Sequence, residues 1–318
     1  MGINPDIQGL ELARLLWQER ADELFAGELA MLEWSSAIGL VGEGSECFGY
    51  DDYQSRDHDW GPGFCVWLSR EDFSQYGDAL QKRYDTLSSH PFDLFQPRLS
   101  ISQGGMKRVG VFCIESFYEQ LLGAPIPQSF EDWRHLNEHG LASATNGEVF
   151  VDADGSFSRI RNELLNYYPD DIRLRKITRG CMRAAQSGQY NFMRQALRGE
   201  ELAAYAALAE FFDATQEIVF ALAKRYRPFY KWSSRILGEL GLFGKEVHMG
   251  LEGILALYKA GQIEGAHGLI NALCSHIAEA LVSHGLSTSN DGWLVTQARE
   301  VNAHISDSHY RQSNLLTI

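Results

Sequence analysis

Residues 42–61 read GEGSECFGYDDYQSRDHDWG, and this stretch decides how the rest of the chain is interpreted. It follows the apolar run SAIGLV at residues 36–41, which is typical of a buried strand. A Gly44-Ser45 pair that ends a strand and opens a helix offers free backbone N–H groups and a hydroxyl, and glycine permits close backbone approach. Because these groups suit the oxygens of a triphosphate, Gly44 and Ser45 are candidate nucleotide-binding residues.

Two aspartates near the end of the same stretch are candidate metal ligands. If Asp57, His58 and Asp59 are extended, side chains two positions apart point to one face, and the two carboxylates converge. Hard oxygen ligands of this kind suit Mg²⁺ or Mn²⁺. A phosphate-binding turn beside such a metal site is a minimal arrangement for phosphoryl or nucleotidyl transfer. The alternative is an acidic surface loop that binds nothing.

The apolar pattern predicts an N-terminal domain of strands and helices, of the α/β kind, over residues 1–125. The expected helices lie at residues 10–25 and 70–84, and the expected strands at 36–41, 64–68 and 109–114. Residues 88–105, which contain Pro91, Pro97 and paired glycines, are expected to form a loop.

The remaining residues, 126–318, are expected to form an all-α helical domain. Residues 146–158 first predict a hairpin that turns at Asp154-Gly155, a strong two-residue turn signal. After it, helical periodicity dominates, with the expected helices at residues 202–226, 247–260 and 266–281. The chain therefore consists of two expected domains of different class.

The string GEGSECFGYDDYQSRDHDWGPGF at residues 42–64 resembles the DUF4037 family of the nucleotidyltransferase superfamily related to DNA polymerase beta. That superfamily's signature is Gly-Ser, a gap of about a dozen residues and Asp-x-Asp. The later strings GEVFVDADGSFSRIRNELLNYYPDD and KRYRPFYKW are similar to the same family, so the likeness spans roughly residues 9–240. The resemblance implies an α+β N-terminal nucleotidyltransferase domain with a mixed, partly antiparallel sheet and helices. It implies Mg²⁺-dependent binding of a nucleoside triphosphate, with ATP expected. It also implies transfer of a nucleoside monophosphate to a hydroxyl of a small molecule or protein.

The resemblance also assigns roles to single residues. Gly44 and Ser45 would hold the triphosphate, and Asp57 and Asp59 would bind metal. The third carboxylate of the superfamily lies on the next core strand, where VGVFCIE at residues 109–115 offers Glu115 alone. If no acid takes that place, the protein binds nucleotide without transferring it, as a regulatory protein. A third possibility is an interaction module, such as an antitoxin-like protein whose helical half holds a partner.

Two stretches, residues 173–198 and 224–235, contain no acidic residue and together carry twelve lysines and arginines. Most of these are expected to lie on solvated helix faces beside acidic neighbours. Lys231 lies between Tyr230 and Trp232. It is either one more solvated lysine or a contact to phosphate, because related enzymes use a helical-domain lysine to contact phosphate. An aromatic neighbour of Lys231 could then stack on a base.

The overall composition limits the partners. The 318 residues carry a net charge of -14, from 42 acidic and 28 basic side chains, which argues against a nucleic-acid ligand. We see no membrane span and no signal peptide, and five scattered cysteines fit free thiols, so a cytoplasmic protein is expected. The expected partners are the nucleotide and an unidentified acceptor, with a protein partner or a second copy also possible.

Overall fold

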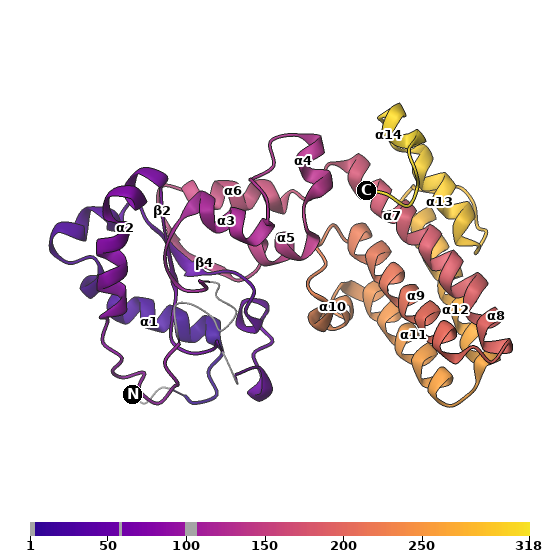
Figure 1. Cartoon of the computed structure of the whole chain (residues 1–318), viewed down its shortest axis with the longest axis horizontal. Helices are drawn as coiled ribbons and strands as arrows, with labels where there is room; N and C mark the ends of the chain where they lie inside the picture. The colour runs from indigo at the N-terminus through magenta and orange to yellow at the C-terminus, as the bar shows by residue number, and fades with distance from the viewer. Residues whose placement is uncertain (1–3, 57–58, 99–106) are drawn as a thin grey trace. The chain divides into compact units, whose positions relative to one another are not determined.

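The structure is a computed structural model that describes residues 4–56, 59–98 and 107–318. Contacts within the chain divide it into two compact units, which Figure 1 shows in sequence colours. The first unit is the chain up to Gln128 together with Leu136–Asn166, and the second is Ser129–His135 with Tyr167–Ile318. The boundary expected at residue 125 differs from this division, because residues 136–166 return to the first unit.

The first unit contains a small sheet and several helices. Its elements are α1 (Gly9–Leu24), η1 (Gly27–Glu33), β1 (Ala37–Leu40), η2 (Ser45–Phe48), η3 (Tyr53–Arg56), β2 (Cys65–Leu68), α2 (Arg70–Asp85), β3 (Gly110–Cys113), α3 (Ile114–Leu122), α5 (Glu138–Thr145), β4 (Glu148–Asp152) and α6 (Ser156–Leu165). The strand order is β3-β2-β1-β4. Strand β1 is antiparallel to both β2 and β4, whereas β2 is parallel to β3. The expected mixed sheet with helices is therefore present in the N-terminal part.

The hairpin expected over residues 146–158 is wrong. Only β4 forms, and it pairs with β1 rather than with a following strand. Gly155 has a φ of 72° and directly precedes α6, while the Asp154 carboxylate accepts a hydrogen bond from the Ser156 N–H at 3.0 Å. The Asp-Gly pair thus marks a helix start. Asp and Gly are favoured both in hairpin turns and at helix starts, where the carboxylate accepts a hydrogen bond from a free N–H of the first turn. The local sequence therefore looks the same in the two cases.

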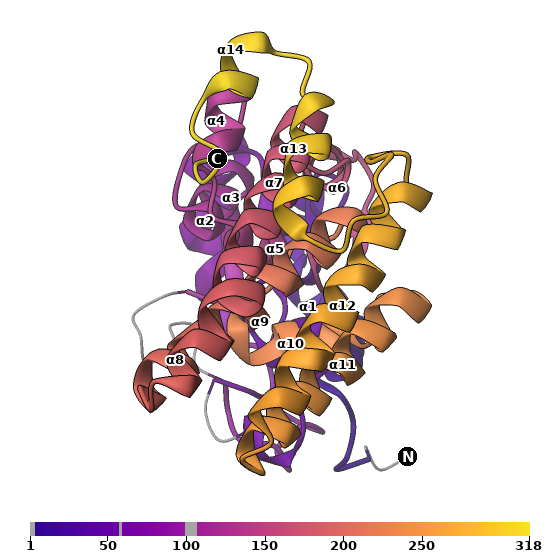
Figure 2. The ribbon, with the colours of Figure 1, turned by 90° about the vertical axis from the view of Figure 1, so that its right-hand side faces the viewer.

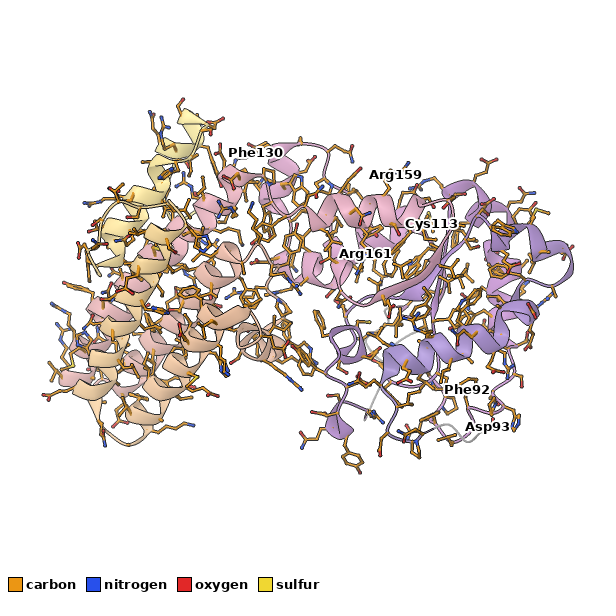
Figure 3. All side chains as sticks on the ribbon, turned by 180° about the vertical axis from the view of Figure 1, so that it is seen from behind. Phe92, Asp93, Cys113, Phe130, Arg159 and Arg161 are labelled. Carbon is orange, nitrogen blue, oxygen red and sulfur yellow. The ribbon has the colours of Figure 1, made fainter. Side chains whose placement is uncertain are left out.

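Aromatic side chains join the sheet to helices on both of its faces. On one face, Phe64 packs edge-on against Trp17 of α1 and Tyr84 of α2, with ring centroids 5.8 and 5.0 Å apart. On the other face, Trp67 packs against Phe117 of α3 and stacks on Phe157 of α6. Alternating residues of one strand point to opposite faces, so this segment ties both helical layers to the sheet. Figures 1 and 3 show α1 on one side of the sheet and α3 and α6 on the other.

The second unit is helical, as expected for the C-terminal part. Its elements are α4 (Phe130–His135), α7 (Asp170–Ala184), the π-helix η4 (Ala185–Phe192), α8 (Met193–Leu197), α9 (Glu201–Leu222), α10 (Tyr230–Leu237), α11 (Gly241–Lys259), α12 (Ile263–Ser283), α13 (Leu294–Ala303) and α14 (Ser308–Gln312). Figure 2 faces this unit, where α7 packs on α9 and α13, and α11 packs on α12. None of the helices in the described ranges is long and apolar enough to cross a membrane.

An ion-pair network joins α7 to α9 inside the second unit. Glu217 is buried, with its side chain 1% exposed, and its two carboxylate oxygens pair with Arg179 and Arg183. Arg183 also contacts Glu210 and Asp213, each at 2.6 Å. Five cations of the acid-free stretches contact acidic side chains: Arg173, Lys176, Arg179, Arg183 and Arg227. Arg175 and Lys176 are buried, so these two do not lie on a solvated helix face as expected.

The network makes the stability of the second unit depend on pH. Burial acts to raise the pKa of Asp213, but Arg227 and Arg183 outweigh it and hold the pKa below its usual value. Because the pKa is lower in the folded state, the stabilisation is complete above the unfolded pKa of about 3.9 and is lost as the pH falls through the folded pKa. We expect Asp213→Asn to flatten the loss of stability below about pH 4. Urea unfolding at pH 6 and pH 3 measures it, and identical pH dependence in variant and wild type would contradict the prediction.

Candidate functional site

The Gly44-Ser45 pair lies where the sequence predicts it. Strand β1 ends at Leu40, Gly44 is the residue before η2, and Ser45 is the first residue of η2. Asn146 fixes the start of this loop, because its side chain accepts a hydrogen bond from the Gly42 N–H at 3.0 Å and donates one to the Gly42 carbonyl at 2.6 Å. The loop is therefore held against Asn146, which lies two residues before β4.

The loop forms one wall of a small pocket that is rich in cationic side chains. Arg98, Lys107 and Arg108 line it together with Glu43. The space left in it is about 10 Å³, room for roughly one water molecule. A triphosphate can therefore enter only if lining side chains move. The remaining lining residues are Leu40, Val41, Gly42, Gly44, Cys47, Phe117, Gln120 and Leu121.

A buried ion pair lies beside Gly44, and its cation, Arg98, lines this pocket. Arg98 Nη2 lies 2.7 Å from Glu46 Oε1, and each side chain is 2% exposed. The Glu46 carboxylate lies so close to Gly44 that a Cβ built there would be 2.2 Å from Glu46 Oε1. Burial acts to lower the pKa of Arg98, but the charge of Glu46 outweighs it, so the guanidinium stays charged. A carboxylate thus occupies the space next to the turn expected to hold phosphate.

Two further cations complete the polar side of the pocket. Lys107 Nζ donates a hydrogen bond to Gln81 Oε1 at 2.7 Å, and burial lowers the pKa of this lysine. Arg108 lies 3.9 Å from the carboxylates of both Glu43 and Asp59. Arg108 therefore connects the pocket beside Gly44 to the candidate metal ligand Asp59.

Asp59 lies close to the pocket, in a conformation that the sequence analysis did not predict. Its φ is 53°, in the left-handed region, so it is not extended as expected. A non-glycine residue in this region carries strain, which is concentrated at functional sites in many proteins. Its side chain is 10% exposed. Asp57, the other expected ligand, lies outside the described residues.

Glu115, the candidate third carboxylate, lies in the first turn of α3 rather than on β3, which ends at Cys113. Its Oε2 accepts a hydrogen bond from the Cys113 thiol at 3.0 Å and lies 4.0 Å from Arg70. Burial acts to raise the pKa of Glu115, but the Cys113 hydrogen bond, a hydrogen bond from its own backbone N–H and the charge of Arg70 together outweigh it, so the pKa is lowered. No contact joins Glu115 to Asp59 in the described part of the chain. The described residues also contain no group of three His, Cys, Asp or Glu side chains that could hold a metal ion.

One acid of the stretch at residues 42–61 has a structural role. The carboxylate of Asp51 is buried and accepts hydrogen bonds from the Gly9 N–H at 2.7 Å and from Trp60 Nε1 at 3.0 Å. It thereby fixes the N-terminus of α1 to the loop that carries Asp59. An anion at a helix N-terminus is favourable because that end of the helix carries partial positive charge.

The sequence analysis missed the cations of the pocket. Arg98 belongs to a segment interpreted only as a loop, and Lys107 and Arg108 lie three and two residues before β3. Their proximity to Gly44 arises because β3 lies next to β2, and β2 next to β1. The only local signal is a basic residue before a predicted strand, which occurs in many surface loops. Lys231 lies exposed in α10 of the second unit, with Nζ 5.2 Å from the Trp232 ring, and its expected phosphate contact stays a prediction.

The first unit is thus a mixed-sheet α+β unit with a cation-lined pocket at the end of a central strand. In comparisons with known proteins, the family model DUF4037, a domain of unknown function, matches residues 133–233. That match includes the two later strings on which the resemblance was based but not the stretch at residues 42–61. No curated protein and no solved structure matches the chain.

Proposed function

We propose that the first unit binds a nucleoside triphosphate with a divalent cation and transfers a nucleoside monophosphate to a hydroxyl of a small molecule or protein. One observation carries the proposal: three cationic side chains and Gly44 of the Gly-Ser pair line the same pocket after the end of β1. Cations and backbone N–H groups are the groups that bind phosphate oxygens. The resemblance of residues 42–64 to the nucleotidyltransferase superfamily supplies the reaction class.

The residues beside the pocket suit a hard divalent cation in part. Asp59 offers a carboxylate that is nearly buried and lies 3.9 Å from the cation of Arg108. With Asp57, it would hold Mg²⁺ or Mn²⁺, which would neutralise charge on the phosphates. Arg98, Lys107 and Arg108 would bind the phosphate oxygens, and the Ser45 hydroxyl would donate a further hydrogen bond. Lys231 remains a proposed phosphate contact of the helical unit.

The second candidate is a nucleotide-binding protein that transfers nothing. The contacts of Glu115 favour it, because its carboxylate is engaged by Cys113 and Arg70, which lie on β3 and α2. A general base must reach the proton it removes, directly or through one water. If no other acid takes this role, nucleotide binding without transfer is the outcome.

The test is a transfer assay with the four α-³²P-labelled nucleoside triphosphates, Mg²⁺ or Mn²⁺, and small-molecule hydroxyl acceptors, with self-labelling of the chain as a further readout. We expect transfer, and a loss of at least about 100-fold in rate for Asp59→Asn, because a ligand of the cation is removed. Asp52→Asn, which removes an exposed acid from the same loop, should change the rate little.

Three results separate the candidates. Transfer that Asp59→Asn leaves unchanged would contradict the assignment of the site. Binding of labelled nucleotide without transfer to any acceptor would favour the second candidate. Failure of all four nucleotides to bind would remove both.

A further inference from the structure

A second, larger cavity in the first unit has Arg98 in common with the pocket beside Gly44, but none of its other lining residues. Its volume is about 360 Å³, within the range of small-molecule sites, roughly 300–1,000 Å³. It is lined by α1, by the end of α2 and by the segment that follows α2. The lining residues are Leu16, Pro62, Tyr84, Asp85, Leu87, Ser88, Ser89, Phe92, Asp93, Phe95, Pro97 and Arg98.

Apolar groups form most of the wall. Leu16 and Phe92 are buried, and Phe95 packs edge-on against Trp60 with ring centroids 5.8 Å apart. Tyr84 adds ring surface, because its hydroxyl is already used: it donates to the Phe64 carbonyl at 2.8 Å and accepts from the Phe64 N–H at 2.9 Å. A wall of this kind favours the apolar body of a ligand. Figure 3 labels Phe92 and Asp93, which lie next to each other in this segment.

The charged groups that line the cavity differ in whether they can pair with a ligand. The guanidinium of Arg98 is buried and paired with Glu46, so its positive charge is neutralised within the protein. Asp85 and Asp93 are exposed instead. Asp85 accepts a hydrogen bond from the neutral Gln81 amide at 2.7 Å, and Asp93 accepts one from the Ser89 hydroxyl at 2.5 Å.

Other cations lie near the cavity. Lys107 Nζ donates to the Gln81 side-chain carbonyl at 2.7 Å, and the same Gln81 amide donates to Asp85, so the charge of Lys107 offsets part of that of Asp85. Arg20 donates to the Ser88 and His90 carbonyls and lies 3.7 Å from Glu23, which shares its charge. His90 Nδ1 lies 3.3 Å from Asp93. Asp85 and Asp93 are therefore the exposed charged groups of the lining, and they make it negative.

We propose that this cavity binds a small molecule with an apolar body of one or two rings and a single ammonium group. The rings would lie against Leu16, Phe92 and Phe95, and the ammonium group would pair with Asp85 and Asp93. The proposal is independent of nucleotide binding at Gly44 and of any transfer reaction.

Three probes of similar size test the charge preference: 2-phenylethylamine, 2-phenylethanol and 3-phenylpropionate, titrated into the full chain at pH 8 and low salt by ligand-observed NMR. We expect the amine to bind about fivefold or more tightly than the alcohol and the carboxylate. The preference is modest because an exposed ion pair contributes little. Asp93→Asn and Asp85→Asn should each remove most of it, because each takes away one of the two carboxylates that would pair with the ammonium group. Asp78→Asn, an exposed acid on the same helix as Asp85 but outside the lining, is the matched control and should leave it unchanged.

A filling variant tests the position of the site. Leu87→Trp should weaken amine binding at least about tenfold while circular dichroism and the melting temperature show a folded chain. The proposal is overturned if the amine fails to bind, if the three probes bind equally, or if folded Leu87→Trp binds the amine like the wild type.

Discussion

Replacing Glu217 by alanine is expected to lower the free energy of unfolding of the second unit by about 3 kcal/mol. The side chain is 1% exposed, and its two carboxylate oxygens contact Arg179 and Arg183. Removing it leaves these guanidinium groups at the α7–α9 interface without their shared buried counter-charge. The cost is large because water reaches the site too little to replace the lost carboxylate.

Urea unfolding followed by circular dichroism measures this change. Glu210→Ala is the matched control: Glu210 contacts the same Arg183 at 2.6 Å, but its side chain is 45% exposed. We expect the control to cost less than about 1 kcal/mol, as exposed ion pairs do. Equal effects of the two substitutions would show that the burial of Glu217 is not what stabilises the interface.

Replacing Glu46 by glutamine is expected to destabilise the first unit by about 3 kcal/mol and to make that loss reversible by polyphosphate. The substitution preserves shape but leaves the buried guanidinium of Arg98 without a counter-charge. A polyphosphate anion that binds beside Gly44 would supply that negative charge. In the variant, the anion would no longer be repelled by the carboxylate of Glu46. A ligand that binds only the folded state raises its stability.

Thermal melting with and without inorganic tripolyphosphate measures both effects. The melting temperature of Glu46→Gln should rise more with tripolyphosphate than that of the wild type. Glu43→Gln is the control, because Glu43 is an exposed acid of the same loop that lies 3.9 Å from Arg108. A variant that is destabilised but responds to tripolyphosphate like the wild type would contradict the role of Glu46 as a stand-in for phosphate.

Local patterns in the sequence predict the elements of this protein well. The apolar runs at residues 36–41, 64–68 and 109–114 correspond to β1, β2 and β3, and the long helical pattern at 202–226 corresponds to α9. These predictions are correct because the burial of one helix face, or of a whole strand, produces a pattern of apolar residues within a short stretch of sequence. The Asp154-Gly155 signal fails because a tight turn and a helix start share their residue types.

The site is predictable only where it is local. Gly44 and Ser45 follow β1 as expected, because the strand and the turn are neighbours in the sequence. Arg98 and Arg108 reach the same pocket only in the folded chain, through the order of strands in the sheet. No local sequence pattern reveals that order. Asp51 and Glu46 look like their acidic neighbours, and only burial distinguishes them as structural groups.

The central claim is that the pocket beside Gly44 binds a triphosphate, and isothermal titration of ATP with Mg²⁺ into the full chain tests it most directly. We predict one site per chain and an affinity about tenfold weaker in Arg108→Gln, since a charge-assisted hydrogen bond to phosphate is lost. Arg83→Gln, which removes a cation of α2 outside the pocket lining, should bind like the wild type. Absence of binding, or equal affinity in Arg108→Gln and the wild type, would contradict the claim.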